Sequence, residues 1–446
     1  MSLVKPPEHL SLLRRLTVVD LTLITIGAIV GSGIFRNPSV VAQRVHIPWL
    51  ILGTWVAGGL IAVLGAFIFA ELGTRRPEDG GLYAYLRDAF HPVIAFMFGW
   101  TTLLIADTSG TAAAAITFAG YIAPSFDPRI VSIGTIAVVT AINCLGVRQG
   151  GTWQNVLVLL KVLAIAGVIV AGFVAHPLAV AAQAGAPFAQ SAPMLAAFGV
   201  AMIPVLFAYN GFQSVSYITG ETRDPGRTLP RGLLLGVAAV VIVYVLVNIA
   251  CLRVLGPAGL AASTAPASAV VQAILGPVGA NLIAIAVALS TLGFMSTKML
   301  LTPRIYFQMA ADGTFFKQIA WVHPKTRVPV VAIVLQGAFA SIIACLGSFE
   351  QILNWSIVEY VFVVLAAIAL FVFRARDREK PAPAIRVPGH PWSTILFIAA
   401  IAGVFVSEGI AFPHDILVGT AIAMLGAAVF FAWRAIATGA RSGQTS

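Results

Sequence analysis

The stretch Thr25-Ile-Gly-Ala-Ile-Val-Gly-Ser-Gly-Ile-Phe-Arg-Asn-Pro38 decides the fold. It lies within an apolar run over residues 18–42, which is long enough to cross a membrane as a helix. Gly31-Ser32-Gly33 interrupts this run near its middle, where glycine is a poor helix former. Lipid tolerates such a break only where protein or a water-filled cavity covers the backbone. The break therefore indicates either a binding site or a close contact between helices.

A helix broken at this point presents two kinds of unpaired backbone group. The half-helix before the break ends in free carbonyls, and the half-helix after it begins with free N–H groups. The carbonyls attract cations and the N–H groups attract anions. One broken helix can therefore hold both charged ends of a zwitterion.

The composition is that of a membrane protein that crosses the bilayer several times. Of the 446 residues, 59% are hydrophobic and only 10% are charged, against roughly a quarter in a soluble domain. The net charge of +10 is spread between the apolar runs, so we predict no nucleic-acid partner. Cys144, Cys251 and Cys345 form no CxxC pair, and we predict neither disulfides nor a metal site.

The apolar runs and the charges between them predict a topology. Most of the 27 Lys and Arg residues fall in alternate loops, which places both termini in the cytoplasm. Twelve transmembrane helices are expected, over residues 18–42, 48–73, 92–122, 130–147, 153–175, 195–219, 232–255, 278–303, 328–347, 351–373, 392–412 and 415–436.

A second break lies in the sixth of these spans. Phe207-Ala-Tyr-Asn-Gly-Phe212 contains Asn210-Gly211, a turn dipeptide inside an apolar run. Breaks in the first and sixth spans are expected if two five-helix halves are related as an inverted repeat. Interrupted helices at corresponding positions of two halves indicate the substrate site of a transporter.

Several motifs resemble the amino acid–polyamine–organocation superfamily, and within it the L-type amino acid transporters and the bacterial serine/threonine exchangers. The resemblance covers about residues 15–390. The matching motifs are Gly27-Ala-Ile-Val-Gly-Ser-Gly-Ile-Phe35, Ala70-Glu-Leu-Gly-Thr74, Gly80-Gly-Leu-Tyr-Ala-Tyr85, Phe207-Ala-Tyr-Asn-Gly-Phe212, Arg227-Thr-Leu-Pro-Arg231, Arg304-Ile-Tyr-Phe307, Asp312-Gly313, His323-Pro324 and Val328-Pro329.

This resemblance implies an all-α membrane fold of the LeuT-like type. It divides the chain into a cytoplasmic N-terminus (1–17), a first inverted repeat (18–175), a second inverted repeat (195–373), helices 11 and 12 (392–436) and a cytoplasmic tail (437–446). The resemblance also implies an amino-acid substrate. Its carboxylate would meet N–H groups at the first break, and its ammonium would meet carbonyls at both breaks. The implied substrate-binding residues are Ile29, Gly31, Ser32, Gly33, Phe207, Ala208, Tyr209, Asn210 and Gly211.

Three charged residues within spans are further candidates. By resemblance, Lys161 lies beside the unwound part of the first helix, where its ammonium would take the place of a sodium ion and act in coupling. The alternative is a lysine that reaches the membrane surface. Asp107 is a second candidate coupling residue: a proton carrier, a contact for a substrate ammonium, or the partner of Lys298. Lys298 and Gln213 are candidate specificity residues.

We therefore expect a cell-membrane transporter for neutral or small L-amino acids, working by alternating access as an exchanger or a proton symporter. A transporter of cationic amino acids or polyamines is the alternative, as is an amino-acid receptor that does not transport. The sequence has no GxxxxGK[ST], HExxH or GxSxG motif, so we expect neither ATP use nor an enzyme, and no cofactor. The short segment 124–129 lacks the cysteine with which animal relatives bond a heavy subunit, so we expect no such partner.

Overall fold

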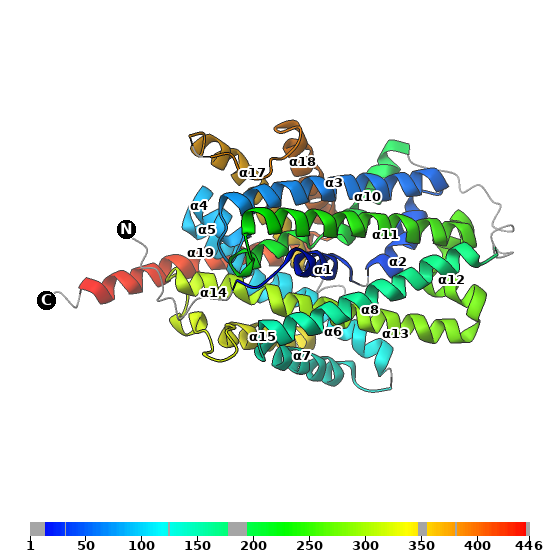
Figure 1. Cartoon of the computed structure of the whole chain (residues 1–446), viewed down its shortest axis with the longest axis horizontal. Coiled ribbons are helices and arrows are strands. Elements are labelled where there is room, and N and C mark those ends of the chain that lie inside the picture. The colour runs from blue at the N-terminus through cyan, green and yellow to red at the C-terminus, as the bar shows by residue number, and fades with distance from the viewer. Residues whose placement is uncertain are drawn as a thin grey trace.

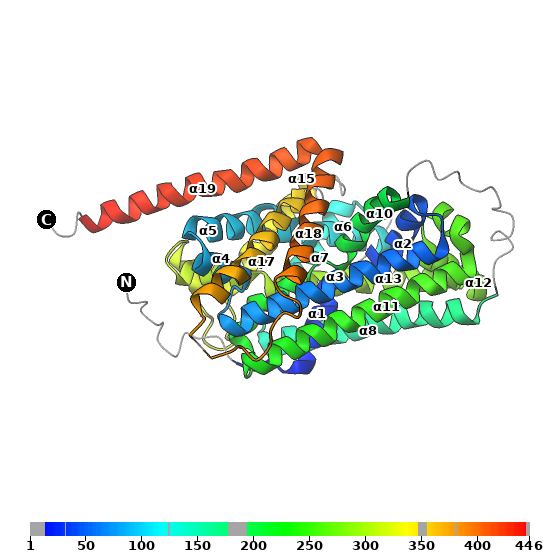
Figure 2. The ribbon, with the colours of Figure 1, turned by 90° about the horizontal axis from the view of Figure 1, so that it is seen from above.

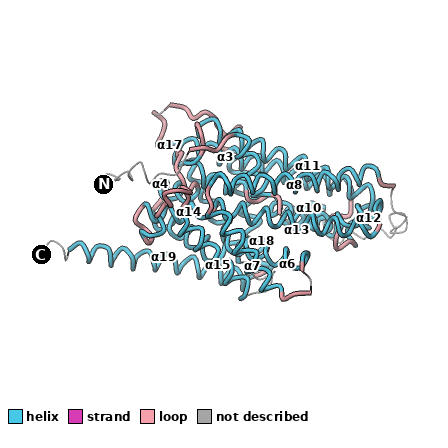
Figure 3. Tube along the Cα trace, turned by 60° about the horizontal axis from the view of Figure 1, so that its bottom comes forward, coloured by secondary structure: helices cyan, strands magenta, loops and turns pink. Residues whose placement is uncertain are grey.

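The chain forms a bundle in which most of the long helices run along the long axis (Figure 1). The structure is a computed structural model and describes residues 14–31, 33–123, 125–176, 194–346, 355–379 and 381–442. Within these ranges the only β-type pairing is an isolated bridge between Leu16 and Thr222. Figure 3 shows most loops at the two ends of the bundle.

The first half of the chain contains α1 (Val18–Ile29), α2 (Gly33–Arg44), α3 (Pro48–Arg75), α4 (Leu82–Ala89), α5 (Pro92–Thr101), the π-helical turn η2 (Thr102–Ala106), α6 (Asp107–Ile122), α7 (Pro128–Cys144) and α8 (Val147–Val174). The second half contains α10 (Met194–Tyr209), the 3-10 helix η3 (Phe212–Glu221), α11 (Pro225–Ala262), α12 (Pro266–Leu275), α13 (Pro277–Leu301), α14 (Pro303–Ala311), η4 (Lys317–Ala320), α15 (Val330–Leu346), η5 (Ser356–Val358), α17 (Glu359–Arg376), α18 (Trp392–Ala411) and α19 (Pro413–Ser442).

Helices long and apolar enough to cross a membrane make up most of the bundle. In the described part of the chain there are eight, or nine if the bent pair α1 and α2 is one span. The eight are Pro48–Arg75, Pro92–Ile122, Gly151–Val174, Ala196–Glu221, Pro225–Ala262, Pro277–Ala311, Trp392–Ala411 and Pro413–Ala435. The chain is therefore a multi-pass membrane protein.

The remaining predicted spans correspond to shorter helices. α7 and α15 have 17 residues each, and α17 has 18 residues with three charged ones near its ends. The count of twelve stays a prediction. The predicted cytoplasmic tail begins inside α19, which continues to Ser442 and extends beyond the other helices at one end of the bundle (Figures 1 and 2).

The broken helix lies in the centre of the bundle. A capping box between Thr17 and Asp20 starts α1, whose residues from Thr25 to Ile29 are all buried. α1 packs mainly against α11 and also against α8 and α13. Gly236 permits this approach of α11, because a Cβ atom there would lie 2.4 Å from the Cβ of Thr25.

Candidate functional site

The first break separates α1 from α2, whose axes differ in direction by 49°. α1 ends at Ile29 because Val30 is extended, with φ −77° and ψ 100°. α2 begins again at Gly33. Among the described residues, the N–H groups of Gly33, Ile34 and Phe35 have no hydrogen-bond acceptor. The break therefore exposes helix N–H groups beside the carbonyls that end α1.

Side chains from neighbouring helices donate hydrogen bonds to two backbone carbonyls at the break. The Lys161 ammonium, from α8, donates to the carbonyl of Val30 at 2.5 Å. The Ser290 hydroxyl, from α13, donates to the carbonyl of Gly31 at 3.2 Å. Lys161 is fully buried, so its side chain does not extend to the surface. Its position ties α8 to the break in the first helix.

The second break follows α10 at Asn210-Gly211. Gly211 has φ +121°, a conformation that residues with a Cβ atom rarely adopt. The amide of Gln213 fixes this turn, because its oxygen accepts from the N–H of Gly211 and its nitrogen donates to Asn210 Oδ1. The Tyr244 hydroxyl of α11 donates to the carbonyl of Ala208 at 3.3 Å.

The two breaks lie against each other. A Cβ atom on Gly211 would lie 2.3 Å from the carbonyl oxygen of Ala28, so the second turn touches the end of α1. The side-chain nitrogen of Asn37 on α2 donates to the carbonyl of Pro204 on α10 at 2.9 Å. Both half-helix junctions therefore face the same space.

That space is a cavity of about 670 Å³. It reaches from the breaks toward α12, because Ala267 and Ser268 of α12 also line it. Figures 1 and 2 place α12 at the end of the bundle away from the extended part of α19. Phe207, which lines the cavity, is 39% exposed. The cavity is large enough for an amino acid.

The structure brings most of the predicted site residues to this cavity. Its lining includes Ile29, Gly31, Gly33, Phe207, Ala208, Asn210, Gly211, Asp107 and Lys298. Tyr209 does not line it: its hydroxyl donates to the carbonyl of Trp55, on the other side of α10. Lys161 and Gln213 lie behind the two breaks. Ser32 lies outside the described residues.

One part of the cavity wall carries buried charged groups. The Lys298 ammonium donates to Asp107 Oδ1 at 2.5 Å and to the Ser214 hydroxyl at 3.3 Å. The Thr302 hydroxyl donates to Asp107 Oδ2 at 2.6 Å. Of the alternatives for Asp107, the structure therefore shows the ion pair with Lys298. Asp107 begins α6 directly after the π-helical turn η2, a kind of irregularity found often at functional sites.

Glu359 is a residue that the sequence analysis did not select. It begins α17, lines the cavity and is 7% exposed. Its Oε1 makes no hydrogen bond with any residue in the described ranges. Together with Asp107 and Lys298 it gives this part of the wall two carboxylates and one ammonium. An acidic residue within the predicted span 351–373 was its sequence signal.

The opposite end of the bundle is closed behind the breaks. The N–H of Leu16 donates to the carbonyl of Glu221, and Glu221 pairs with Arg304 at 2.7 Å with both side chains about 1% exposed. Asp79 accepts from the N–H of Gly220 at 2.9 Å. Burial, and then the nearby Glu221, raises the pKa of Asp79 to about 7. These contacts join the segment before α1, the loop after α3 and α14 to the end of η3.

The chain has clear similarity to known proteins. Residues 16–433 match the profile of the family described as amino acid permease. The chain is 32% identical to the b(0,+)-type amino acid transporter 1 of Rattus norvegicus over 396 residues, which are 86% of this chain and 80% of the relative.

Two other relatives also match most of the chain. The serine/threonine exchanger SteT of Bacillus subtilis is 29% identical over 93% of this chain and 95% of its own length. The large neutral amino acids transporter small subunit 2 of Homo sapiens is 28% identical over 94% of this chain and 80% of its own length.

Proposed function

The chain belongs to the amino acid permease family, and we propose that it is a secondary active transporter of neutral or small L-amino acids that works by alternating access. Amino-acid transport and a non-enzymatic role follow from the family. One observation carries the finer proposal: two helices break side by side against one cavity of about 670 Å³. This arrangement supplies N–H and carbonyl groups at a single place.

The substrate lies between the two breaks in this proposal. Its carboxylate accepts hydrogen bonds from the free N–H groups that begin α2, of which Gly33 lines the cavity. Its ammonium meets the carbonyls that end α1 and α10, at Ile29 and Ala208. Phe207 closes over the substrate when the cavity closes. The 39% exposure of Phe207 and the contacts of Glu221 support an outward-open state.

The substrate side chain points toward the charged part of the wall. The charge of Asp107 is already balanced by Lys298, which supports a neutral substrate. The printed names of two relatives, a serine/threonine exchanger and a transporter of large neutral amino acids, support the same choice. Glu359 favours the alternative, a cationic amino acid or polyamine, since its carboxylate forms no ion pair with any residue in the described part of the chain.

We propose that Lys161 couples transport to the shape of the first helix. Its ammonium holds the carbonyl of Val30, as a bound cation would. Exchange is supported by the printed name of the Bacillus subtilis relative, and proton symport is the alternative.

We also propose the wider organisation. Twelve helices form two inverted five-helix repeats, over 18–175 and 195–373, followed by helices 11 and 12. Both termini lie in the cytoplasm of a cell whose plasma membrane holds the protein. No heavy subunit is attached by a disulfide, because the segment 124–129 has no cysteine.

Reconstitution in liposomes tests this function. We would follow uptake of a labelled amino-acid mixture into vesicles that are empty or preloaded with unlabelled amino acids, with and without an inward proton gradient. Uptake that requires preloading identifies an exchanger. Uptake into empty vesicles that rises with the gradient identifies a proton symporter. Binding without uptake under any condition would contradict a transporter and favour a receptor.

A further inference from the structure

A second, smaller cavity lies away from the substrate cavity, between the end of α3, the end of α17 and the segment before α18. Its volume is about 200 Å³. Among the described residues, its charged lining consists of four arginines and one aspartate: Arg75, Arg374, Arg378, Arg386 and Asp377. None of these residues belongs to the proposed substrate site, so this cavity needs a separate explanation.

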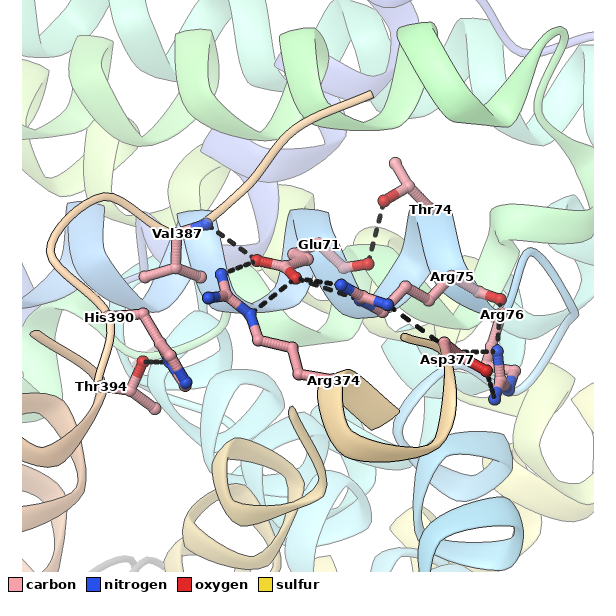
Figure 4. A network of polar contacts seen from close by, with 9 residues as sticks. All are labelled: Glu71, Thr74, Arg75, Arg76, Arg374, Asp377, Val387, His390 and Thr394. Atoms are coloured by element: carbon pink, nitrogen blue, oxygen red, sulfur yellow. Dashed lines mark hydrogen bonds and ion pairs between the residues drawn. The ribbon is translucent and has the colours of Figure 1, made fainter. Parts of the chain in front are cut away.

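The inner arginines are fixed by a buried acid. Glu71 on α3 is fully buried and accepts from Arg75 at 2.8 Å and from Arg374 at 2.5 Å (Figure 4). It also accepts from the N–H of Val387 at 2.8 Å. In the same network, Asp377 Oδ2 lies 3.6 Å from Arg75 Nη1. Glu71 therefore holds the guanidinium groups of Arg75 and Arg374 in place.

The positive charges of the outer arginines, Arg378 and Arg386, are not balanced by an acid in the described ranges. Arg378 and Arg386 are exposed, and neither makes a hydrogen bond or an ion pair with any residue in the described ranges. They stand on the rim of a cavity whose inner arginines are already oriented. The cavity therefore carries an excess of positive charge with free guanidinium N–H donors.

The cavity lies where the chain enters the membrane. The segment that contains Arg386 leads into α18, a candidate membrane span, whose first residue, Trp392, is 77% exposed. Exposed tryptophan at the end of a span is typical of the membrane–water interface. Basic cavities between helix ends at this depth favour lipid headgroups with a phosphate.

We propose that this cavity binds a phosphate group, carried either by an anionic lipid headgroup or by a small soluble phosphate ester. The planar guanidinium fork matches phosphate oxygens in pairs, which an ammonium group does not. Bound phosphate joins the two outer arginines to the network around Glu71. It thereby clamps the end of α17 and the segment before α18 to the end of α3.

The test compares two double variants that lose the same charge. Arg378→Gln/Arg386→Gln removes the outer arginines. Arg223→Gln/Arg227→Gln is the control, because both of its arginines are exposed and outside the cavity. Among the described residues, the Arg227 side chain forms one ion pair, at 3.9 Å with the exposed Asp224. The full chain is purified in detergent and titrated with dioleoyl phosphatidylglycerol, dioleoyl phosphatidylcholine or sn-glycerol 3-phosphate, and bound molecules are counted by native mass spectrometry.

The first variant should bind its phosphate ligand at least about tenfold more weakly than wild type, because charge-assisted hydrogen bonds are lost. The control should bind as wild type does. If glycerol 3-phosphate does not displace bound phosphatidylglycerol, the ligand is a lipid headgroup. Displacement, or binding of glycerol 3-phosphate alone, identifies a soluble ester. Equal losses in both variants, or no loss in the first, would overturn the proposal. Arg378→Lys/Arg386→Lys should recover only part of the affinity.

Discussion

Substituting Gly211 by alanine tests whether the contact between the two breaks is needed for the site. The new Cβ atom would lie 2.3 Å from the carbonyl oxygen of Ala28 and 2.9 Å from its carbonyl carbon. The φ of +121° adds backbone strain of about 1–3 kcal/mol for a residue with a side chain. Overpacking against the end of α1 adds about 1–3 kcal/mol. Gly211→Ala should therefore cost about 2–6 kcal/mol in all.

Gly31→Ala is the matched control at the first break. Its φ is not positive, and its new Cβ atom would lie 3.7 Å from Phe294, an ordinary contact distance. A compatible glycine-to-alanine change is neutral or stabilising by about 0.4–1 kcal/mol. Gly31→Ala should therefore have a thermal unfolding midpoint equal to that of the wild type or slightly above it.

The assay combines thermal unfolding of the purified protein, followed by tryptophan fluorescence, with amino-acid uptake into liposomes. Gly211→Ala should lower the midpoint and abolish uptake, because the end of α1 moves. A Gly211→Ala protein with the midpoint and the uptake of the wild type would refute the reasoning. A large loss of stability in Gly31→Ala would refute it as well.

Three further predictions follow from buried charges. Lys161→Met removes the donor to the carbonyl of Val30, so uptake should fall about tenfold or more while the folded yield is retained; uptake kinetics like those of the wild type would rule out the coupling role. Asp107→Asn strands the Lys298 ammonium and should destabilise the protein by about 3–5 kcal/mol, and adding Lys298→Met should restore most of the midpoint; additive losses would disprove the pairing. Asp79 has a folded pKa of about 7, above its ordinary 3.8, so its contribution to stability is full below pH 3.8 and is lost as pH rises through about 7. The midpoint of Asp79→Asn should therefore exceed that of the wild type by more at pH 8 than at pH 5, and an equal difference at both would contradict the raised pKa.

The broken helices could be predicted from the sequence because their signals are local. The pair of glycines at positions 31 and 33 and the Asn210-Gly211 dipeptide each interrupt a helix within one turn of backbone. The expected spans over residues 48–73 and 392–412 closely match α3 and α18, because the signal for a span is also local in sequence. Hydropathy over about 20 residues is sufficient to find such helices.

The charged wall of the cavity could not be predicted in full, because it depends on contacts between distant residues. Asp107 and Lys298 are 191 positions apart, and the sequence alone left their pairing as one of several alternatives. Glu359 is an ordinary acidic residue within the predicted span 351–373 until the fold places it in the lining of the same cavity as Asp107 and Lys298. The clamp around Glu71 likewise joins residues more than 300 positions apart.

The central claim is that an amino acid binds between the two breaks, and a structure with bound substrate tests it most directly. We would determine the structure of the protein with a saturating concentration of the L-amino acid that shows the strongest saturable uptake. The account predicts the substrate carboxylate within hydrogen-bond distance of the N–H of Gly33, and the ammonium beside the carbonyls of Ile29 and Ala208. A substrate bound elsewhere in the protein, or bound in this cavity with its two charged groups away from both breaks, would contradict the account.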